Sequence, residues 1–133
     1  MGETNAQIVE AAYKRFEQLG SPESTLVGPG FVWDMTHMAS WPEQRLFEGR
    51  DGMLQFLAEW TASWEDWRLE VDAIHERGDK VVALCHQHGR SKASGLEVEM
   101  VFAQVWTMRD GQYRRMEMYS DIDNAFADAG IRL

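Results

Sequence analysis

The sequence predicts an α+β fold in which a curved antiparallel sheet packs against helices. In the N-terminal half, apolar residues recur at intervals of three and four, the period of an amphipathic helix. From Trp67 onward they alternate with polar residues, the period of a strand. Turn-forming pairs at 78–79, 94–95 and 110–111 divide this half into consecutive strands, which such short turns make antiparallel. The 133 residues suffice for one domain, 1–133, with its own core.

The N-terminal region predicts two helices. Thr4 and Gln7 have the spacing of a capping box, and apolar residues then recur at helical intervals up to Gly20. Ser21 stands before a proline, which is typical of an N-cap and predicts a short second helix through about Val27. The glycine–proline–glycine run that follows should end this helix.

The middle of the chain predicts a strand, a loop and a third helix. FVWDM, residues 31–35, is rich in strand-forming residues, and residues 36–48 have the character of a loop with a short strand near 45–47. Asp51 is placed to cap the helix that follows. One face of that helix carries a stripe of bulky residues: Met53, Phe56, Leu57, Trp60 and Trp64.

The last part of the chain predicts a run of strands and a closing helix. The strands span roughly 67–76, 80–90, 96–108 and 112–120. A short helix should begin at Ser120 or Asp121 and end near Gly130. We expect the helices to lie on one side of the curved sheet and to enclose a pocket against it.

Composition limits the partners of the protein. The formal net charge is −9 and the 13 basic residues are scattered, which disfavours nucleic acids and anionic membranes. No apolar run approaches the length of a membrane span, about 18 residues, and the N-terminus lacks the pattern of a signal peptide. The single cysteine, Cys85, cannot form an intramolecular disulfide. We therefore expect a soluble, cytoplasmic protein with no nucleic-acid or membrane partner.

Five stretches resemble the NTF2-like superfamily, and within it the SnoaL-like group. They are residues 13–20 at the end of the first helix, FVWDM (31–35), FEGRDGMLQFLAEW (47–60), GRSKASGLEVEMVFAQVWTMRDG (89–111) and YSDIDNAFADAGI (119–131). The resemblance implies a cone-shaped fold around a hydrophobic pocket, and a homodimer formed through the exposed face of the sheet. Relatives include ketosteroid isomerases, polyketide cyclases, scytalone dehydratase, limonene epoxide hydrolase and proteins that are not enzymes, so function must be argued from the site.

The resemblance implies catalytic roles for three residues. Asp34 falls where ketosteroid isomerases carry their general base, and Tyr13 resembles their oxyanion-stabilising tyrosine. Gln104 stands where those enzymes carry a second oxyanion group, an acid. An amide donates a hydrogen bond but supplies no acidic proton, so this departure argues against faithful steroid isomerisation. The alternative for Asp34 is that strand alternation points it at solvent.

Three histidines are further candidates. His37 follows Asp34 by three residues and either returns toward the pocket mouth, where it would assist proton transfer, or is a solvated loop residue. His86 and His88 share one face of a strand, and they line the pocket if that face is concave. Their spacing would also suit a metal, but the sequence marks no third ligand, and we expect no metal site.

The wall of the pocket is predicted from alternating strand residues and from the tryptophans. The candidates for substrate binding are Trp33, Trp41, Trp60, His86, His88, Phe102, Met118 and Ser120. Met118 occupies the face on which epoxide hydrolases of this superfamily are expected to carry an acid, and methionine cannot move a proton. Asp121 is then interpreted as a helix cap.

Two functions are compatible with these residues. The first is a cofactor-independent enzyme of SnoaL-like type that acts on a small hydrophobic carbonyl compound by Asp34-mediated proton abstraction, as an isomerase, cyclase or dehydratase. The second is a binding module that holds a small molecule or dimerises without chemistry. The sequence contains no phosphate-binding glycine loop, nucleophile elbow or paired CxxC, so no cofactor is expected.

Overall fold

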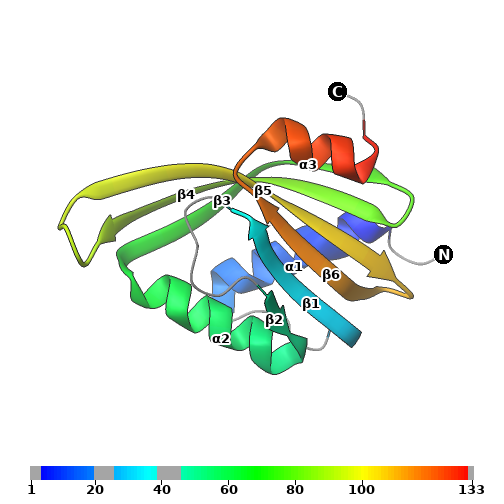
Figure 1. The fold of residues 1–133 in the computed structure, drawn as a ribbon, viewed down its shortest axis with the longest axis horizontal. Coiled ribbons are helices and arrows are strands. Elements are labelled where there is room, and N and C mark those ends of the chain that lie inside the picture. The colour runs from blue at the N-terminus through cyan, green and yellow to red at the C-terminus, as the bar shows by residue number, and fades with distance from the viewer. Residues whose placement is uncertain (1–3, 20–25, 39–45, 132–133) are drawn as a thin grey trace.

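The computed structural model describes residues 4–19, 26–38 and 46–131, and Figure 1 draws its helices and strands. The elements are α1 (Asn5–Leu19), β1 (Val27–His37), β2 (Leu46–Glu48), α2 (Gly49–Ala62), β3 (Trp64–Arg77), β4 (Lys80–Ser91), β5 (Glu97–Arg109), β6 (Gln112–Tyr119) and α3 (Ile122–Ala129). The predicted α+β class is confirmed: helices pack on a curved, mostly antiparallel sheet.

The sheet has the strand order β2-β1-β6-β5-β4-β3. Strands β3 to β6 form the predicted antiparallel meander. β1 adds to the other edge of β6 in the parallel direction, and β2 pairs antiparallel with β1. The meander turns contain Gly78, Gly95 and Gly111 with φ of 58°, 72° and 74°, a backbone conformation that glycine adopts without steric cost.

Helices cover both faces of the sheet. Val81 of β4 lies in one core with Val9 of α1 and Phe56 of α2, and we call this side the inner face. Val82, the next residue of β4, lies in a second core with Phe126 of α3 on the opposite side, the outer face. Figure 1 likewise has α3 across the sheet from α1 and α2. The expectation of helices on one side only is wrong, because the central strands are apolar on both faces.

The sequence predicted the N-terminus of α1 correctly but not that of α2. The capping box is confirmed: Thr4 N donates to Gln7 Oε1 at 2.8 Å, and Gln7 N donates to Thr4 Oγ1 at 3.1 Å. α2 begins earlier than predicted, because it follows directly from the end of β2. Glu48 is its N-cap residue without a side-chain bond, and Asp51 lies in the first turn instead of capping it.

β1 is longer than the FVWDM strand predicted from sequence. It begins at Val27, so the predicted second helix does not extend to this residue, and its expected start at Ser21 lies outside the described residues. The glycine–proline–glycine run 28–30 falls inside β1, where the pairing with β6 is irregular between Val27 and Val32. The run therefore interrupts strand pairing rather than ending a helix.

The bulky stripe predicted for the third helix divides between two elements. Met53, Phe56 and Trp60 are buried on α2 as expected. Trp64 is the first residue of β3 and not part of the helix, because α2 ends at Ala62. The stripe thus continues onto the sheet, and this continuity brings several aromatic rings to one place.

Candidate functional site

A cavity of about 60 Å³ lies between the inner face of the sheet and the helices α1 and α2. Four tryptophans line it, one each from β1, α2, β3 and β5: Trp33, Trp60, Trp67 and Trp106. Phe102 of β5 and Met118 of β6 also belong to the apolar wall. Trp33, Trp60, Phe102 and Met118 therefore lie where the sequence predicted them. Trp41 lies outside the described residues.

Two of the predicted catalytic residues meet on the cavity wall. The Tyr13 hydroxyl on α1 donates a hydrogen bond to Gln104 Oε1 on β5, and Trp106 Nε1 donates to the Tyr13 hydroxyl at 2.9 Å. Burial is the main reason that the pKa of Tyr13 is raised well above its usual value. The phenol is therefore a neutral hydrogen-bonding group at physiological pH.

Gln87 of β4 is a second polar group of the cavity, and the sequence analysis missed it. It is only 1% exposed. Its Oε1 accepts hydrogen bonds from Trp60 Nε1 at 2.8 Å and Trp67 Nε1 at 3.0 Å. Its amide nitrogen, Nε2, has no hydrogen-bond partner among the described residues. The sequence offered only a partial signal: Gln87 shares one face of β4 with Val81, Ala83 and Cys85, but only the structure identifies that face as the inner one.

Asp34 does not line the cavity. It is paired with Glu117 of β6, while its neighbour Trp33 is paired with Met116 of the inner core. Successive residues of a strand point to opposite faces, so Trp33 faces the cavity and Asp34 faces outward. The placement of the expected base in the pocket is therefore wrong for this structure. The reason is the alternation of side chains along β1: Trp33 takes the inner position, so the next residue, Asp34, points to the other face.

Asp34 is nevertheless buried, at 3% exposure, and it is held by specific partners. Arg115 Nη2 donates to Asp34 Oδ2, and Thr36 N donates to Asp34 Oδ1 at 2.7 Å. Burial, the largest influence, raises the pKa of Asp34, but the hydrogen bonds from Thr36 and the charges of Arg115 and His37 hold it below its usual value overall. The carboxylate is ionised at neutral pH and has an ion-pair partner.

His37 and Ser120 also lie away from the cavity. The His37 ring stacks on Tyr119, with centroids 4.3 Å apart, and its Nε2 lies 3.3 Å from Glu117 Oε2. The Ser120 hydroxyl donates to the His37 carbonyl at 3.3 Å. Tyr119 belongs to the outer core with α3. His37 therefore does not reach the pocket mouth to assist proton transfer, and Ser120 does not line the pocket, contrary to the two predictions.

His86 and His88 lie on the outer face as well. They have the same parity on β4 as Val82, the outer-face reference. Their side chains contact the acidic residues Glu70 and Glu99 rather than the cavity. Of the two alternatives that the sequence left open, the structure places both histidines on the face away from the cavity, so neither lines the pocket.

The cavity can donate hydrogen bonds but offers no ordinary base. No described residue of its lining is an aspartate, glutamate, histidine, lysine or arginine. Cys85, buried near Tyr13, is no nucleophile at neutral pH, because desolvation raises its pKa to about 12. The arrangement therefore suits recognition of a flat apolar molecule with a hydrogen-bonding oxygen.

Among the described residues, no helix is both long and apolar enough to cross a membrane. A comparison with curated proteins finds no match.

Solved structures share the fold over nearly their whole length. TerC, co-crystallised with polyporic acid, is 25% identical with a TM-score of 0.70, covering 94% of this chain and 96% of its own. An NTF2-like protein from Burkholderia thailandensis is 23% identical with a TM-score of 0.73, covering 98% and 100%. A candidate SnoaL-like polyketide cyclase from Jannaschia is 20% identical with a TM-score of 0.70, covering 99% of each chain.

The family comparison agrees with the fold. The SnoaL-like domain matches residues 14–116, which runs from within α1 into β6 and includes the strands β1 to β5 entirely. The matched region contains most of the cavity wall, although Tyr13 precedes it by one residue. The chain therefore belongs to the SnoaL-like domain family and has the NTF2-like fold.

Proposed function

We propose that the protein binds a small, flat and mostly apolar molecule in the inner cavity, through a carbonyl or hydroxyl oxygen of that molecule. The observation that carries the proposal is the amide nitrogen of Gln87, which is buried and has no hydrogen-bond partner within the part of the chain that the structure describes. A buried donor without a partner costs about 1–3 kcal/mol, and a ligand oxygen beside it would recover that free energy.

The surroundings of Gln87 support a ligand oxygen as its partner. The indole nitrogens of Trp60 and Trp67 both donate to the oxygen of the amide, so its orientation is determined by its neighbours. The nitrogen is then the only end of the amide left to meet a ligand. The four tryptophans around it offer flat apolar surfaces, on which an aromatic ligand would be desolvated and stacked. TerC, crystallised with polyporic acid, is consistent with a small-molecule role for this fold.

The proposal can be tested with two molecules of the same shape, 1-indanone and indane, which differ by one carbonyl group. Quenching of the intrinsic tryptophan fluorescence reports their binding, since four tryptophans line the cavity. We expect 1-indanone to bind wild-type protein more tightly than indane by roughly 5- to 150-fold, the range equivalent to about 1–3 kcal/mol. Polyporic acid serves as a larger third probe.

The Gln87→Met variant should abolish the preference for the ketone, because methionine fills the space but donates no hydrogen bond. Gln55→Met is the matched control, since Gln55 is exposed on α2 and contacts Glu59 rather than the cavity. Equal affinity of wild-type protein for the ketone and the hydrocarbon, or no response to any of the three probes, would contradict the proposal.

A cofactor-independent proton transfer, as an isomerase, cyclase or dehydratase, is a second candidate function. The observation that favours it is the network of Tyr13, Gln104 and Trp106, in which a neutral phenol lies on the cavity wall as in oxyanion-stabilising sites. Relationship to polyketide cyclases and ketosteroid isomerases is consistent with it. The outward direction of Asp34 weighs against this residue as the base, because Asp34 could reach the cavity only after a rearrangement of β1.

Proton transfer and simple binding differ in one measurement. A carbonyl ligand of the cavity, incubated with the protein in deuterated water, should exchange its α-protons faster than in buffer if proton abstraction occurs. Asp34→Asn should then lower the exchange rate by about 10²- to 10⁴-fold if Asp34 is the base. If exchange is no faster than in buffer, only the binding function remains. If exchange is faster but unaffected by Asp34→Asn, Asp34 has no part in the mechanism.

We also propose that the protein forms a homodimer through the outer face and works in the cytoplasm. Val101 of β5 supports the dimer, because this apolar side chain is 52% exposed and has outer-face parity with Ala103. The location is supported by cysteine usage: Cys85 is a free, buried thiol, which is compatible with a reducing compartment.

A further inference from the structure

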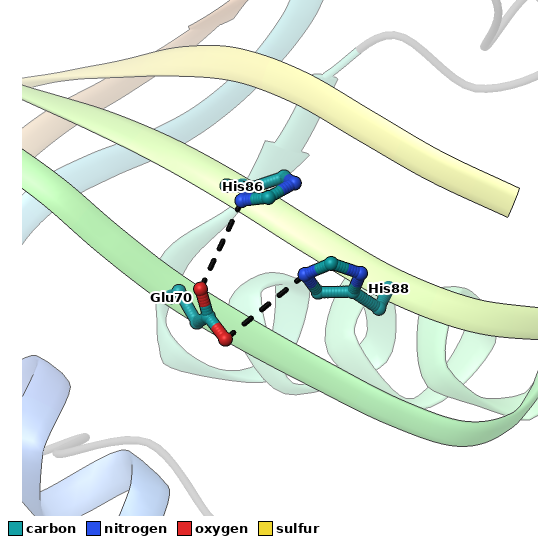
Figure 2. A group of neighbouring side chains, drawn as sticks. All are labelled: Glu70, His86 and His88. Carbon is teal, nitrogen blue, oxygen red and sulfur yellow. Dashed lines mark ion pairs between the residues drawn. The ribbon is translucent and has the colours of Figure 1, made fainter.

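Two histidines and a glutamate gather on the outer face of the sheet, away from the cavity. Glu70 lies on β3, and His86 and His88 lie two residues apart on the neighbouring strand β4. Glu70 is paired with His86 in the β3–β4 register. Figure 2 shows the carboxylate of Glu70 facing both imidazole rings, with one dashed line to His86 and one to His88.

The donor atoms of this cluster converge. His86 Nδ1 lies 3.8 Å from Glu70 Oε2, and His88 Nε2 lies 4.0 Å from Glu70 Oε1. Each of the three residues offers one ligand atom, and these three atoms all lie within 4.8 Å of one another. Bonds of about 2.0–2.2 Å to a tetrahedral zinc ion would bring these atoms to separations of roughly 3.3 Å. Glu70, with 57% of its side chain exposed, has the freedom to make this adjustment.

A second glutamate orients one of the histidines. His86 Nε2 is hydrogen-bonded to Glu99 Oε1 of β5, on the side of the ring opposite to Glu70. When Nε2 carries the proton that Glu99 accepts, the lone pair of Nδ1 is directed toward Glu70 and is available to a metal. A carboxylate that accepts from the second nitrogen of a ligating histidine is a recurrent feature of metal sites.

We propose that Glu70, His86 and His88 bind a divalent transition-metal ion, with Zn²⁺ as the best-fitting ion and Glu99 as a positioning residue. Two imidazole nitrogens and one carboxylate oxygen form a ligand set that zinc uses, and a water molecule would complete the tetrahedron. Mg²⁺ and Ca²⁺ prefer all-oxygen surroundings and should bind poorly. The site is distinct from the cavity, which lies on the other face of the sheet.

The cluster is accessible and its carboxylates favour a cation. The side chains of His86 and His88 are 20% and 33% exposed, and an open groove lined by Arg68, His88 and Glu99 passes beside them. Arg68 is the basic residue nearest in register, opposite His88, and its side chain is exposed to solvent. Two negative carboxylates at the cluster are available to balance the charge of a divalent ion.

A second group of possible ligands is less suitable. Asp34, His37 and Glu117 also bring donor atoms within 4.8 Å of one another. However, both oxygens of Asp34 already accept hydrogen bonds, from Thr36 and from the Arg115 cation. A metal there would have to displace a guanidinium, whereas the partners of Glu70 in the first group are the two histidines themselves.

The test uses the full chain without an affinity tag, treated with EDTA and dialysed into chelator-free buffer. Isothermal titration with ZnCl₂ should give one zinc per chain, and Mg²⁺ in excess should not compete. Co²⁺ should produce the visible absorption of a tetrahedral complex. We expect His86→Gln, His88→Gln and Glu70→Gln each to weaken zinc binding by more than tenfold, and Glu99→Gln to weaken it by about tenfold.

Two histidine variants are matched controls. His75→Gln changes a histidine of β3 whose ring packs on Phe126, and His37→Gln changes the competing group. Both should bind zinc as wild-type protein does. Circular dichroism checks folding, and Glu70→Gln, at an exposed position, decides the result if a histidine variant misfolds. The proposal is overturned if wild-type protein does not bind zinc, if Glu70→Gln binds it equally well, or if His37→Gln abolishes binding.

Discussion

Asp34, the acid in FVWDM, forms an ion pair with Arg115 and does not line the cavity. Asp34 lies between Arg115 and the backbone N–H of Thr36, and its side chain is only 5% exposed. An acid within an apolar strand is tolerated when it is paired and hydrogen-bonded, and both conditions hold here. The charged residue therefore contributes to the attachment of β1 to β6, which is the one parallel pairing among the described strands.

At the residue scale, Asp34→Asn should destabilise the protein. Because the pKa of Asp34 is lowered in the folded state, the ionised carboxylate stabilises folding above the ordinary pKa of about 4, and this contribution is lost as the pH falls below it. We expect the variant to lose about 1.5–3 kcal/mol of unfolding free energy at pH 7, as for a hydrogen bond to a charged group. Urea denaturation at pH 7 and pH 3.5 measures the difference, which should shrink at the lower pH.

Asp72→Asn is the control for this change, since Asp72 is exposed on β3. Its unfolding free energy should stay within about 0.5 kcal/mol of wild type, the usual range for surface substitutions. Equal stability of Asp34→Asn and wild type at pH 7 would show that the ion pair with Arg115 contributes nothing to folding.

At the element scale, α3 depends on signals at its two ends. It is only eight residues long, so intrinsic helix propensity alone would not maintain it. Asp121 Oδ1 accepts a hydrogen bond from Asn124 N at 3.2 Å, and Gly130 ends the helix with a φ of 73°. The helix in turn covers the outer core through Phe126. The residues that cap α3 therefore help to keep the outer core covered from solvent.

Asp121→Ala should weaken this helix, because it leaves the N–H of Asn124 without its partner. We expect a loss of about 1 kcal/mol in unfolding free energy, within the range of 0.5–2 kcal/mol for N-cap residues. Asp123→Ala, which removes an acid from the same first turn but no cap bond, should cost only about 0.3–1 kcal/mol. Thermal denaturation of the two variants side by side compares them, and an equal cost would argue that only helix-dipole electrostatics matters here.

At the scale of the whole molecule, the two sheet faces have different tasks. The inner face, together with α1 and α2, forms the aromatic cavity. The outer face carries α3, the Asp34–Arg115 pair and the histidine cluster, and it leaves Val101 exposed. One sheet therefore separates the buried cavity, where we propose that a small molecule binds, from the outer face, where we propose the metal site and the dimer interface.

The proposed dimer gives a prediction at this scale. Val101→Glu would introduce a charge into an outer-face interface, and desolvating that charge opposes association. Light scattering coupled to gel filtration should find a dimer for wild-type protein and a shift toward monomer for the variant. Leu54→Glu is the control, because Leu54 is a similarly exposed apolar residue (41%) on α2, away from the outer face. A monomeric wild-type protein, or a shift in both variants, would contradict the proposed interface.

Local patterns in the sequence were sufficient for most of the fold. The capping box at Thr4, the meander turns, the alternation from Trp67 onward and the Asp121 cap are decided by neighbours within a few residues, and the structure has all of them. Boundaries were less accurate where one element runs directly into the next. Asp51 and Trp64 were misassigned because β2, α2 and β3 follow one another almost without linkers.

The functional site depended on information that the sequence does not contain. Strand periodicity determines that Trp33 and Asp34, or Gln87 and His88, point to opposite sides, but not which side faces the cavity. That choice is made only when β1 pairs with β6 and the helices cover one face, which brings Tyr13, Gln87 and Gln104 together around the tryptophans. In the same way, the partners of Asp34 and of His86 come from strands distant in sequence, so only tertiary packing decided that both residues lie on the outer face.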